Sequence, residues 1–473
     1  MGTVEVEPTT SAVSGVAQQL ERAAAEFVRE HRLPGAAVGV VHGGELVWSA
    51  GVGYADIESR RAPDRQTLYR VASITKTFTG TAIMQLRDEG RLHLDDPAVA
   101  HLPELRGAES PFGPIETVTI RRLLSHESGL MGDPPGTDWT EPAYEGDPRA
   151  NLARVAEIGT RVPPNAQEKY SNLGCQLLGE IVARVSGMAY AEYLDEAILG
   201  PLGMVSSGFD PLPDDLERRR ATGYGPRGFS DDLAVSVAPP PCQAEGGLSS
   251  SLEDLARWIS FQFSHDGGPR KGAQVLAGST LAEMHRPRYL ATEADWRIAW
   301  GLTWYAERRD DGVWVQHSGG IHGFTTNVCF DPRAKVGGIA LVNGNSDPEK
   351  LSVELATIAR DAVLALPVPV AAPDPLPPEW RDLLGLYADR DYLQVVRLEW
   401  RDGKLTFLDP GWPDWKPTLA PTADPDRFVV EPGMRDSGEP CVFRRRADGR
   451  IHSVVLASLV LSRLDPVAAS DQP

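Results

Sequence analysis

The stretch VASITK, residues 71–76, stands at the start of a helix predicted over residues 73–89 and closed by Gly90. Its spacing places Ser73 Oγ and Lys76 Nζ on one helical face, one turn apart. A serine hydroxyl is a weak nucleophile until a neighbouring group accepts its proton. A lysine does this only when neutral, so the pKa of Lys76 is expected to fall from about 10.4 towards about 7. Alone, S-x-x-K is a weak signal, because short matches arise by chance in a chain of 473 residues.

Two further motifs lie downstream of this stretch. Tyr170-Ser171-Asn172 stands just before a strong helical pattern over residues 172–185, and His317-Ser318-Gly319-Gly320 ends a predicted strand. The patterns G-x-S-x-G, H-E-x-x-H and G-x-x-x-x-G-K-[ST] are absent from the chain. These absences argue against an α/β-hydrolase elbow, a zinc protease site and a phosphate-binding loop.

The predicted elements divide the chain into a larger and a smaller part. Strand patterns at residues 36–55 and beyond residue 297 enclose a helical middle, and amphipathic helices are predicted at residues 12–31 and 349–366. This order predicts an α+β domain within residues 1–366, in which an antiparallel sheet is flanked by helices and joined to a helical region.

A proline-rich segment marks the boundary between the two parts. Residues 367–379, PVPVAAPDPLPPE, contain six prolines and predict a stiff linker. Residues 380–473 contain short strand patterns separated by Asp-Gly turns, enough for about eight strands. They predict a small antiparallel β-barrel or sandwich.

Composition limits the partners and the location. Lysine and arginine number 47 and aspartate and glutamate 66, so the net charge is 47 − 66 = −19. An acidic surface argues against nucleic acid and anionic membranes as main partners. The chain shows neither a signal-peptide pattern nor a span of about 18 apolar residues, so a cytoplasmic protein is expected. No metal or cofactor is predicted, and four scattered cysteines are expected to be buried thiols: Cys175, Cys242, Cys329 and Cys441.

Taken together and in this order, the three motifs resemble those of the serine β-lactamase and penicillin-binding protein superfamily. The surrounding sequence is similar to class C β-lactamase-type proteins over about residues 12–366. The similar segments are TIRRLLSHESGL (119–130), PLGM (201–204), EGGLSSSLEDLARW (245–258), WGLTW (300–304) and GGIHGF (319–324). The resemblance implies the β-lactamase/transpeptidase-like fold for the larger domain. The smaller domain resembles the lipocalin-like barrels appended to D-aminopeptidases, some esterases and penicillin-binding-type thioesterases.

The resemblance also implies a role for each matching residue. Ser73 would be the acylated nucleophile and Lys76 its activator. Tyr170 would share in proton transfer, and the division of work between Lys76 and Tyr170 stays open. Asn172 would hold the substrate carbonyl side and orient Lys76. The backbone N–H groups of Ser73 and Gly320 would form the oxyanion hole.

The third motif departs from class C β-lactamases, which have Lys-Thr-Gly where this chain has His317-Ser318-Gly319. Ser318 and Gly319 would bind substrate, and His317 would line the far wall of the site. A histidine is mostly neutral at pH 7, whereas a lysine offers a fixed charge to the carboxylate of penicillins. At pH 5.5 an ordinary histidine would become charged, which is expected to shift preference towards carboxylate-bearing substrates.

The H-x-G form resembles family VIII carboxylesterases, D-aminopeptidases and penicillin-binding-type thioesterases. The expected activity is therefore metal-independent hydrolysis of small esters or amides through an acyl-enzyme, on a small-molecule or peptide acyl substrate. Acyl transfer to an amine, D-stereospecific peptidase activity and a non-catalytic binding protein stay open, as does a homodimer. Glu245 and Tyr224 are further candidates for substrate contacts, and His322 is interpreted as a loop residue.

Overall fold

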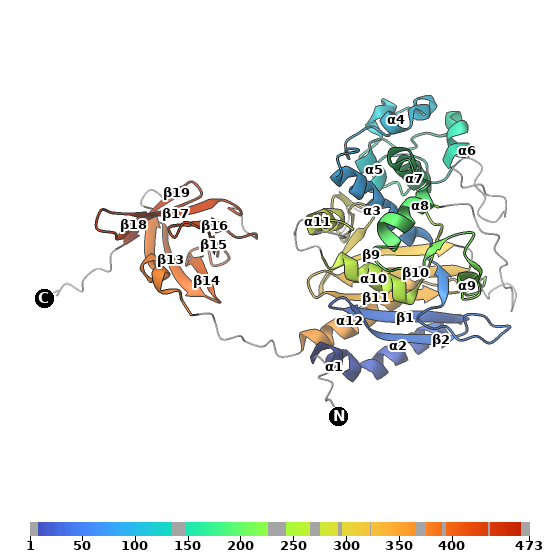
Figure 1. The fold of residues 1–473 in the computed structure, drawn as a ribbon, viewed down its shortest axis with the longest axis horizontal. Coiled ribbons are helices and arrows are strands. Elements are labelled where there is room, and N and C mark those ends of the chain that lie inside the picture. The colour runs from blue at the N-terminus through green and yellow to red at the C-terminus, as the bar shows by residue number, and fades with distance from the viewer. Residues whose placement is uncertain are drawn as a thin grey trace. The chain divides into compact units, whose positions relative to one another are not determined.

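The computed structural model describes residues 8–134, 148–225, 243–264, 275–291, 296–321, 323–365, 375–389, 394–433 and 436–464. The chain divides into two compact units, Met1–Leu366 and Pro367–Pro473 (Figure 1). Most of the predicted proline-rich linker, like Cys242 and His322, lies outside the described residues.

An eight-stranded antiparallel sheet forms the centre of the first unit, in the order β2-β1-β11-β10-β9-β8-β7-β6. Strands from the two ends of the unit pair within this sheet, where Ala36 of β1 lies opposite Val342 of β11. The predicted α+β architecture is confirmed. The strands are β1 (Gly35–His42), β2 (Glu45–Gly53), β6 (Tyr289–Leu290), β7 (Ile298–Trp300), β8 (Tyr305–Arg309), β9 (Gly312–Ile321), β10 (Phe324–Asp331) and β11 (Val336–Val342).

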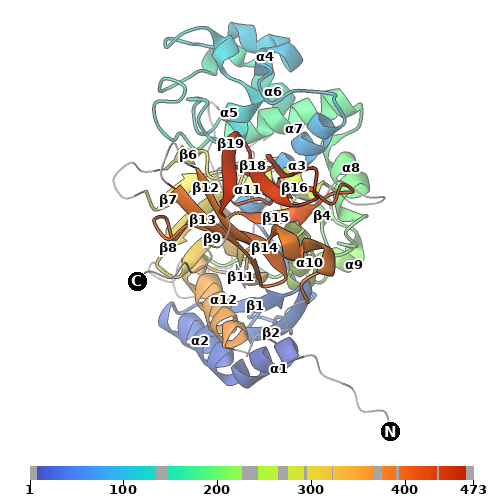
Figure 2. The same cartoon turned by 90° about the vertical axis from the view of Figure 1, so that its left-hand side faces the viewer.

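One face of the sheet is covered by α1 (Pro8–Gly15), α2 (Ala17–Glu30) and α12 (Pro348–Leu364), as Figures 1 and 2 show. Their apolar stripes, including Leu20 of α2, pack with sheet residues such as Trp314 in one buried cluster. The prediction of a single helix over residues 12–31 is wrong in one respect, because the helix is interrupted between α1 and α2. Gly15, a residue type that weakens helices, stands at this break.

The opposite face of the sheet carries the helical region and a larger core. Its central helices are α3 (Thr75–Asp88), α7 (Asn172–Ser186) and α10 (Leu252–Gln262), and Phe78 of α3 stacks on Trp258 of α10 with ring centroids 3.8 Å apart. The remaining elements are α4 (Ala98–His101), α5 (Ile120–Leu124), α6 (Pro148–Ala153), α8 (Tyr190–Leu194), α9 (Asp214–Glu217), α11 (Gly278–His285) and a small sheet of β3 (Leu68–Arg70), β4 (Gly208–Phe209) and β5 (Leu248–Ser251).

The ends of α7 and α10 follow their local sequence signals. Gly187 ends α7 with φ of 80°, a left-handed conformation that glycine adopts without steric cost. Ser251 begins α10 by accepting a hydrogen bond from the backbone N–H of Asp254. The Asp254 carboxylate in turn accepts hydrogen bonds from Ser206 N and Ser207 Oγ.

The second unit is a closed antiparallel barrel of eight strands around an aromatic core that includes Tyr387, Phe407, Phe428 and Phe443. The predicted barrel is therefore confirmed. Its strands are β12 (Gly385–Asp389), β13 (Gln394–Arg401), β14 (Lys404–Leu408), β15 (Thr418–Pro421), β16 (Arg427–Val430), β17 (Pro440–Arg445), β18 (Ile451–Leu456) and β19 (Leu459–Leu464).

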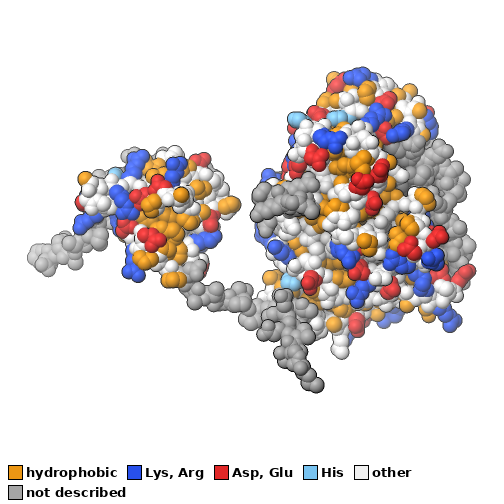
Figure 3. Space-filling model, in the orientation of Figure 1, with side chains coloured by type: hydrophobic (Ala, Val, Ile, Leu, Met, Phe, Trp, Pro, Cys, Tyr) orange, Lys and Arg blue, Asp and Glu red, His pale blue; other side chains and the backbone are white. Residues whose placement is uncertain are grey.

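The surface charges, the helices and the cysteines can be compared with what the composition predicts. On the face of the first unit that Figure 3 displays, acidic and basic side chains are interspersed. Within the described ranges, no helix combines the length and the apolar character needed to cross a membrane. Three cysteines are free and buried: Cys175, Cys329 and Cys441.

Candidate active site

Ser73 lies on a sharp turn between β3 and α3. The predicted helix over residues 73–89 begins with a 3₁₀ turn, Ala72–Ile74, and becomes α-helical only at Thr75. Ala72 has φ of 47°, a left-handed conformation that costs a non-glycine residue roughly 1–3 kcal/mol. Thr75 Oγ1 fastens the turn by donating to Ala72 O at 2.6 Å and accepting from Leu248 N at 3.2 Å. The turn places Ser73 in the wall of a cavity.

Lys76 lies one turn beyond Ser73, on the same side of the helix, as the spacing predicts. Its side chain is fully buried. Nζ donates to Ser73 Oγ at 3.1 Å, to Asn172 Oδ1 at 2.8 Å and to the backbone O of Glu245 at 2.5 Å. These three acceptors match the three N–H donors of an ammonium group.

The pKa of Lys76 is raised above its ordinary value, which contradicts the expected fall towards about 7. Burial lowers this pKa, but the charge and hydrogen bond of Tyr170 and the charges of Cys175 and Glu245 together raise it by more. The acceptors around Nζ act in the same direction, because hydrogen bonds to a charged group favour the charged form. Lys76 therefore keeps its proton at neutral pH.

Tyr170 is held beside Lys76 by ring packing. Lys76 Nζ lies 5.0 Å from the centroid of the Tyr170 ring. The His126 ring packs against Tyr170 in a tilted arrangement, with 4.3 Å between the two ring centroids. His126 Nδ1 accepts a hydrogen bond from Ser171 N at 3.3 Å, which supports the segment that carries Tyr170. Burial, followed by the charge of Lys76, holds the pKa of His126 well below its ordinary value, so the ring is neutral.

Asn172 is oriented by a carboxylate that no sequence motif marks. Asn172 Nδ2 donates to Asp133 Oδ1 at 2.7 Å, and this bond turns Oδ1 of the amide towards Lys76. Asp133 lies about forty residues from Asn172 in the chain, and only the folded structure brings the two side chains together. Sequence reasoning therefore missed Asp133.

Strand β9 passes close behind the nucleophile. A Cβ atom on Gly319 would lie 2.2 Å from Val71 O, so only glycine allows this approach. Gly320 follows and lines the same cavity as Ser73. The backbone N–H groups of these two residues are the expected pair of donors in the oxyanion hole. Ser318 and Gly319, predicted to bind substrate, do not line this cavity. Gly319 instead packs against the backbone of the turn at Ser73.

His317 differs from its predicted place in the site. It is buried between Trp300 and Tyr305, with centroid distances of 5.8 Å and 5.9 Å, and does not line the cavity. Its Nδ1 donates to Ser318 O at 2.6 Å. Burial, with the charge of Lys76, lowers the pKa of His317 to about 3. The ring is neutral as expected, but pH 5.5 does not charge it, so the expected shift in preference has no basis in this histidine.

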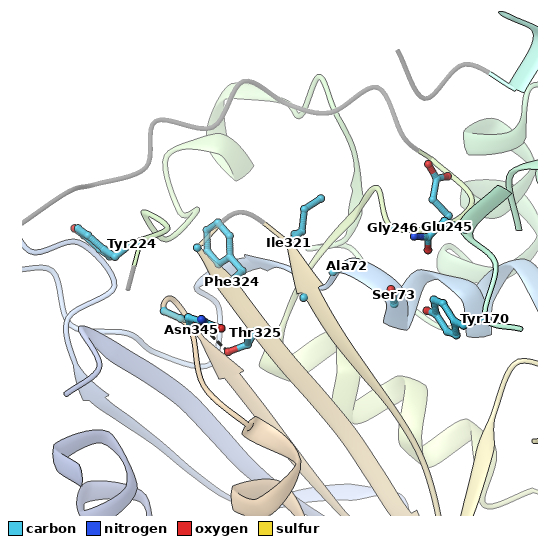
Figure 4. A pocket seen from close by; sticks show the side chains of 15 residues that line it. Ala72, Ser73, Tyr170, Tyr224, Glu245, Gly246, Ile321, Phe324, Thr325 and Asn345 are labelled. Atoms are coloured by element: carbon cyan, nitrogen blue, oxygen red, sulfur yellow. Dashed lines mark hydrogen bonds between the residues drawn. The ribbon is translucent and has the colours of Figure 1, made fainter. Parts of the chain in front are cut away.

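The cavity at Ser73 has a volume of about 560 Å³ (Figure 4). Ser73 and Tyr170 lie side by side at one end, and the other end carries the aromatic side chains of Tyr224 and Phe324 together with the polar ones of Thr325 and Asn345. Both further candidates, Tyr224 and Glu245, belong to its lining, which consists of Ala72, Ser73, Tyr170, Asn172, Tyr224, Gly225, Glu245, Gly246, Gly320, Ile321, Gly323, Phe324, Thr325, Gly344 and Asn345.

Solved structures share this architecture. The octameric penicillin-binding protein homologue from Pyrococcus abyssi superposes with a TM-score of 0.62 at 24% identity, over 94% of this chain and 99% of that one. SurE, in a crystal structure with D-Leu, gives a TM-score of 0.57 at 27% identity, over 96% of this chain and 99% of its own. A class C beta-lactamase gives a TM-score of 0.60 at 22% identity, over 78% of this chain and 99% of its own.

Sequence comparisons agree with the fold. Protein flp of Staphylococcus aureus (strain N315) is 27% identical over 332 residues, 70% of this chain. The match spans 64% of the length of that relative, less than two thirds. Residues 20–362 match the family described as Beta-lactamase. This match runs through the turn at Ser73, the Tyr170 segment and β9, and it covers most of the chain, which therefore belongs to the beta-lactamase family.

Proposed function

We propose that this protein is a metal-independent serine hydrolase that acts on small esters or amides through an acyl-enzyme. The observation that carries the proposal is the contact of Lys76 Nζ with Ser73 Oγ at 3.1 Å and Asn172 Oδ1 at 2.8 Å, beside a cavity that Ser73 lines. Nucleophilic catalysis by serine needs such a hydroxyl with proton-handling groups at hand. Purified protein should hydrolyse p-nitrophenyl butyrate and lose this activity after stoichiometric reaction with a fluorophosphonate.

In the proposed acylation step, Ser73 Oγ attacks the substrate carbonyl carbon and its proton passes to Tyr170. Tyr170 accepts this proton in its phenolate form, which the charge of the protonated Lys76 stabilises, and thereby becomes a neutral phenol, while Lys76 donates a hydrogen bond to Ser73 Oγ. The bond to the leaving group then breaks, and Tyr170 gives the proton to the departing oxygen or nitrogen. In deacylation, water attacks the acyl carbon while Tyr170 accepts the proton of the water. Tyr170 then returns this proton to Ser73 Oγ as the ester bond breaks, and the acid is released.

Two backbone donors are proposed to stabilise the tetrahedral intermediate. The N–H groups of Ser73 and Gly320 belong to elements that Gly319 brings into close contact. Loss of one such donor typically costs about 10²–10³ in rate, so the fit of Gly319 against Val71 matters for catalysis.

Uncharged acyl groups should be preferred over β-lactams. Among the described residues that line the cavity, none is lysine or arginine, and His317 is neutral. A carboxylate on the substrate therefore lacks a charged hydrogen bond worth about 10- to 150-fold in affinity. At pH 7.5, kcat/KM for p-nitrophenyl butyrate should exceed that for nitrocefin by at least about tenfold. Efficient nitrocefin turnover would contradict this account of the cavity.

Acyl transfer to an amine is a second candidate. It is favoured by the likeness to SurE at 27% identity over 96% of this chain, because that structure contains D-Leu, an amino acid. A D-stereospecific peptidase would use the same acyl-enzyme. Adding hydroxylamine or an amino-acid ester to the ester assay separates these activities, because a transferase forms the amide in preference to the free acid. A purely binding protein is disfavoured, since it would not need the Ser73–Lys76 contact.

We further propose that the first unit carries the catalytic groups alone. Ser73, Lys76, Tyr170 and Asn172 all belong to the unit Met1–Leu366. A protein that ends at residue 366 should still react with a fluorophosphonate at Ser73 at a rate within about threefold of the full chain. If the shortened protein folds, as judged by circular dichroism, but is not acylated, the barrel supplies part of the site.

The penicillin-binding protein homologue from Pyrococcus abyssi, which has the same fold, is octameric. Self-association of this chain into a homodimer or a larger oligomer is therefore proposed, and light scattering tests it. A cytoplasmic location stays a prediction.

A further inference from the structure

Glu245 presents two different groups to the site. Its backbone O accepts the hydrogen bond from Lys76 Nζ at 2.5 Å, which ties this residue to the nucleophile. Its carboxylate turns away from Ser73, as Figure 4 shows. Although the residue is only 2% exposed, just one carboxylate oxygen is satisfied, since Oε1 accepts from Gln176 Nε2 at 2.6 Å. Oε2 has no partner within the described part of the chain.

Glu245 belongs to the walls of two cavities. Glu245 lines the cavity at Ser73 and also a second cavity of about 290 Å³, whose wall includes Gln176, Tyr190 and Gln243. Buried polar groups are normally paired, because an unpaired one loses its hydration without compensation. An unpaired carboxylate oxygen on a residue that lines both cavities is therefore suited to a donor that arrives with the substrate.

The surrounding charges favour a positively charged donor. Lys76 directs its three donors to Ser73, Asn172 and the Glu245 backbone, and none to the Glu245 carboxylate. In the second cavity the other carboxylate, Glu180, is paired with Arg149 and Arg184. Glu245 is thus an acceptor for which a substrate cation would supply the missing hydrogen bond.

We propose that the Glu245 carboxylate binds a protonated primary amino group of the substrate, so that the preferred acyl groups carry an ammonium group. This inference rests on the proposed acyl-enzyme function and names its substrate class. The ammonium group would donate to Oε2 while the scissile carbonyl reaches Ser73. The same open oxygen would repel a carboxylate-bearing acyl group.

The test compares pairs of p-nitrophenyl esters that differ only in an ammonium group replaced by methyl. The pairs are 3-aminopropanoate with butanoate and 6-aminohexanoate with heptanoate. For each pair the preference is the ratio of kcat/KM for the amino ester to that for the alkyl ester. At pH 8 the preference of the wild type should exceed that of Glu245→Gln by about tenfold or more for at least one pair, since charged hydrogen bonds contribute that much.

Glu180→Gln is the matched control, because Glu180 lines the second cavity but is paired with arginines. Its preference should stay within about twofold of the wild type. Equal preferences in the wild type and Glu245→Gln would overturn the inference. Fluorophosphonate labelling of Ser73 separates this failure from that of the proposed function: an unlabelled wild type refutes the function, whereas a labelled protein without amine preference refutes only the cation site.

The pH dependence gives a second measurement that needs no variant. Burial raises the pKa of Glu245 to about 7, against the lowering effects of the Gln176 hydrogen bond and Lys76, and Asp133 adds to the rise. The carboxylate is thus about one tenth ionised at pH 6 and about nine tenths at pH 8, while an alkylammonium group stays charged. The amine preference of the wild type should rise by roughly ninefold between these values. A preference that is constant with pH would contradict the proposal.

The other groups around Glu245 do not reproduce this change. Lys76 has a raised pKa and stays charged, and burial raises the pKa of Cys175 to about 11 and raises that of Tyr190 as well. Among the described residues, the histidines His126 and His317 near the site have lowered pKa values and stay neutral. The charged groups facing the same region are Asp133, Glu180, Arg149 and Arg184.

Discussion

Replacing Ser73 by alanine should lower kcat/KM for p-nitrophenyl butyrate by at least about 10⁴-fold. A catalytic serine acts as a unit with its proton-transfer partners, and removing it from comparable hydrolases costs up to about 10⁶-fold. The substitution removes one oxygen atom from a turn that Thr75 and Ala72 hold by their own hydrogen bond, so the fold should persist. Stopped-flow or steady-state release of p-nitrophenol measures the loss.

Ser59→Ala provides the matched control for this substitution, because Ser59 is an exposed serine that bonds to Asp56. Its activity should equal that of the wild type. Full activity in Ser73→Ala, with a melting temperature like the wild type, would remove Ser73 from the mechanism and would leave the turn at Ala72 without a catalytic purpose.

Replacing Lys76 by methionine should lower kcat/KM by about 10³-fold or more. Methionine matches the length of the stem but offers no donor, so Ser73 Oγ and Asn172 Oδ1 lose the bonds they accept, and the charge that stabilises a Tyr170 phenolate is lost. The buried Glu245 backbone O also loses the hydrogen bond from Lys76, at about 1–3 kcal/mol in folding free energy. The rate of Ser73 acylation by a fluorophosphonate should fall together with ester turnover.

Lys350→Met is the control for this change, because Lys350 is an exposed residue of α12 whose ammonium group pairs with Asp347, the residue before that helix. It should leave both rates unchanged. Lys76→Met with wild-type acylation would mean that Ser73 is activated without Lys76, and the contact at 3.1 Å would then have only a structural role.

The parts of the fold that local sequence signals control could be predicted. The helix α7 runs between Asn172 and its glycine stop because periodicity and a terminal glycine act within a few residues. The pairing of β1 with β11 joins segments about 300 residues apart, which no local rule specifies. The resemblance to a known family supplied that arrangement for the first unit. The single helix predicted over residues 12–31 failed because apolar periodicity continues across the break after Gly15.

The site shows the same division. The spacing of Ser73 and Lys76 predicts their contact, because a helix fixes the geometry over one turn. The sign of the pKa shift at Lys76 was missed, because the shift depends on Tyr170, Cys175 and Glu245, which the fold brings to Lys76 from distant segments. Asp133 was missed for the same reason.

His317 was predicted to line the cavity, and its burial between Trp300 and Tyr305 depends on how the two flanking strands pair with β9. The strained φ at Ala72 could not be expected from an alanine, which favours helical conformations. Such positions are set by tertiary contacts rather than by local propensity.

The most direct test of the central claim is the site of covalent labelling. Trypsin cleaves after Arg70 and Lys76 and releases the peptide VASITK, which contains two hydroxyl groups, on Ser73 and Thr75. After reaction with a fluorophosphonate, the peptide should carry one adduct per chain, and its fragment ions should place that adduct on Ser73. An adduct on Thr75 or on any other peptide, or no adduct on a protein that hydrolyses p-nitrophenyl butyrate, would contradict a mechanism through a Ser73 acyl-enzyme.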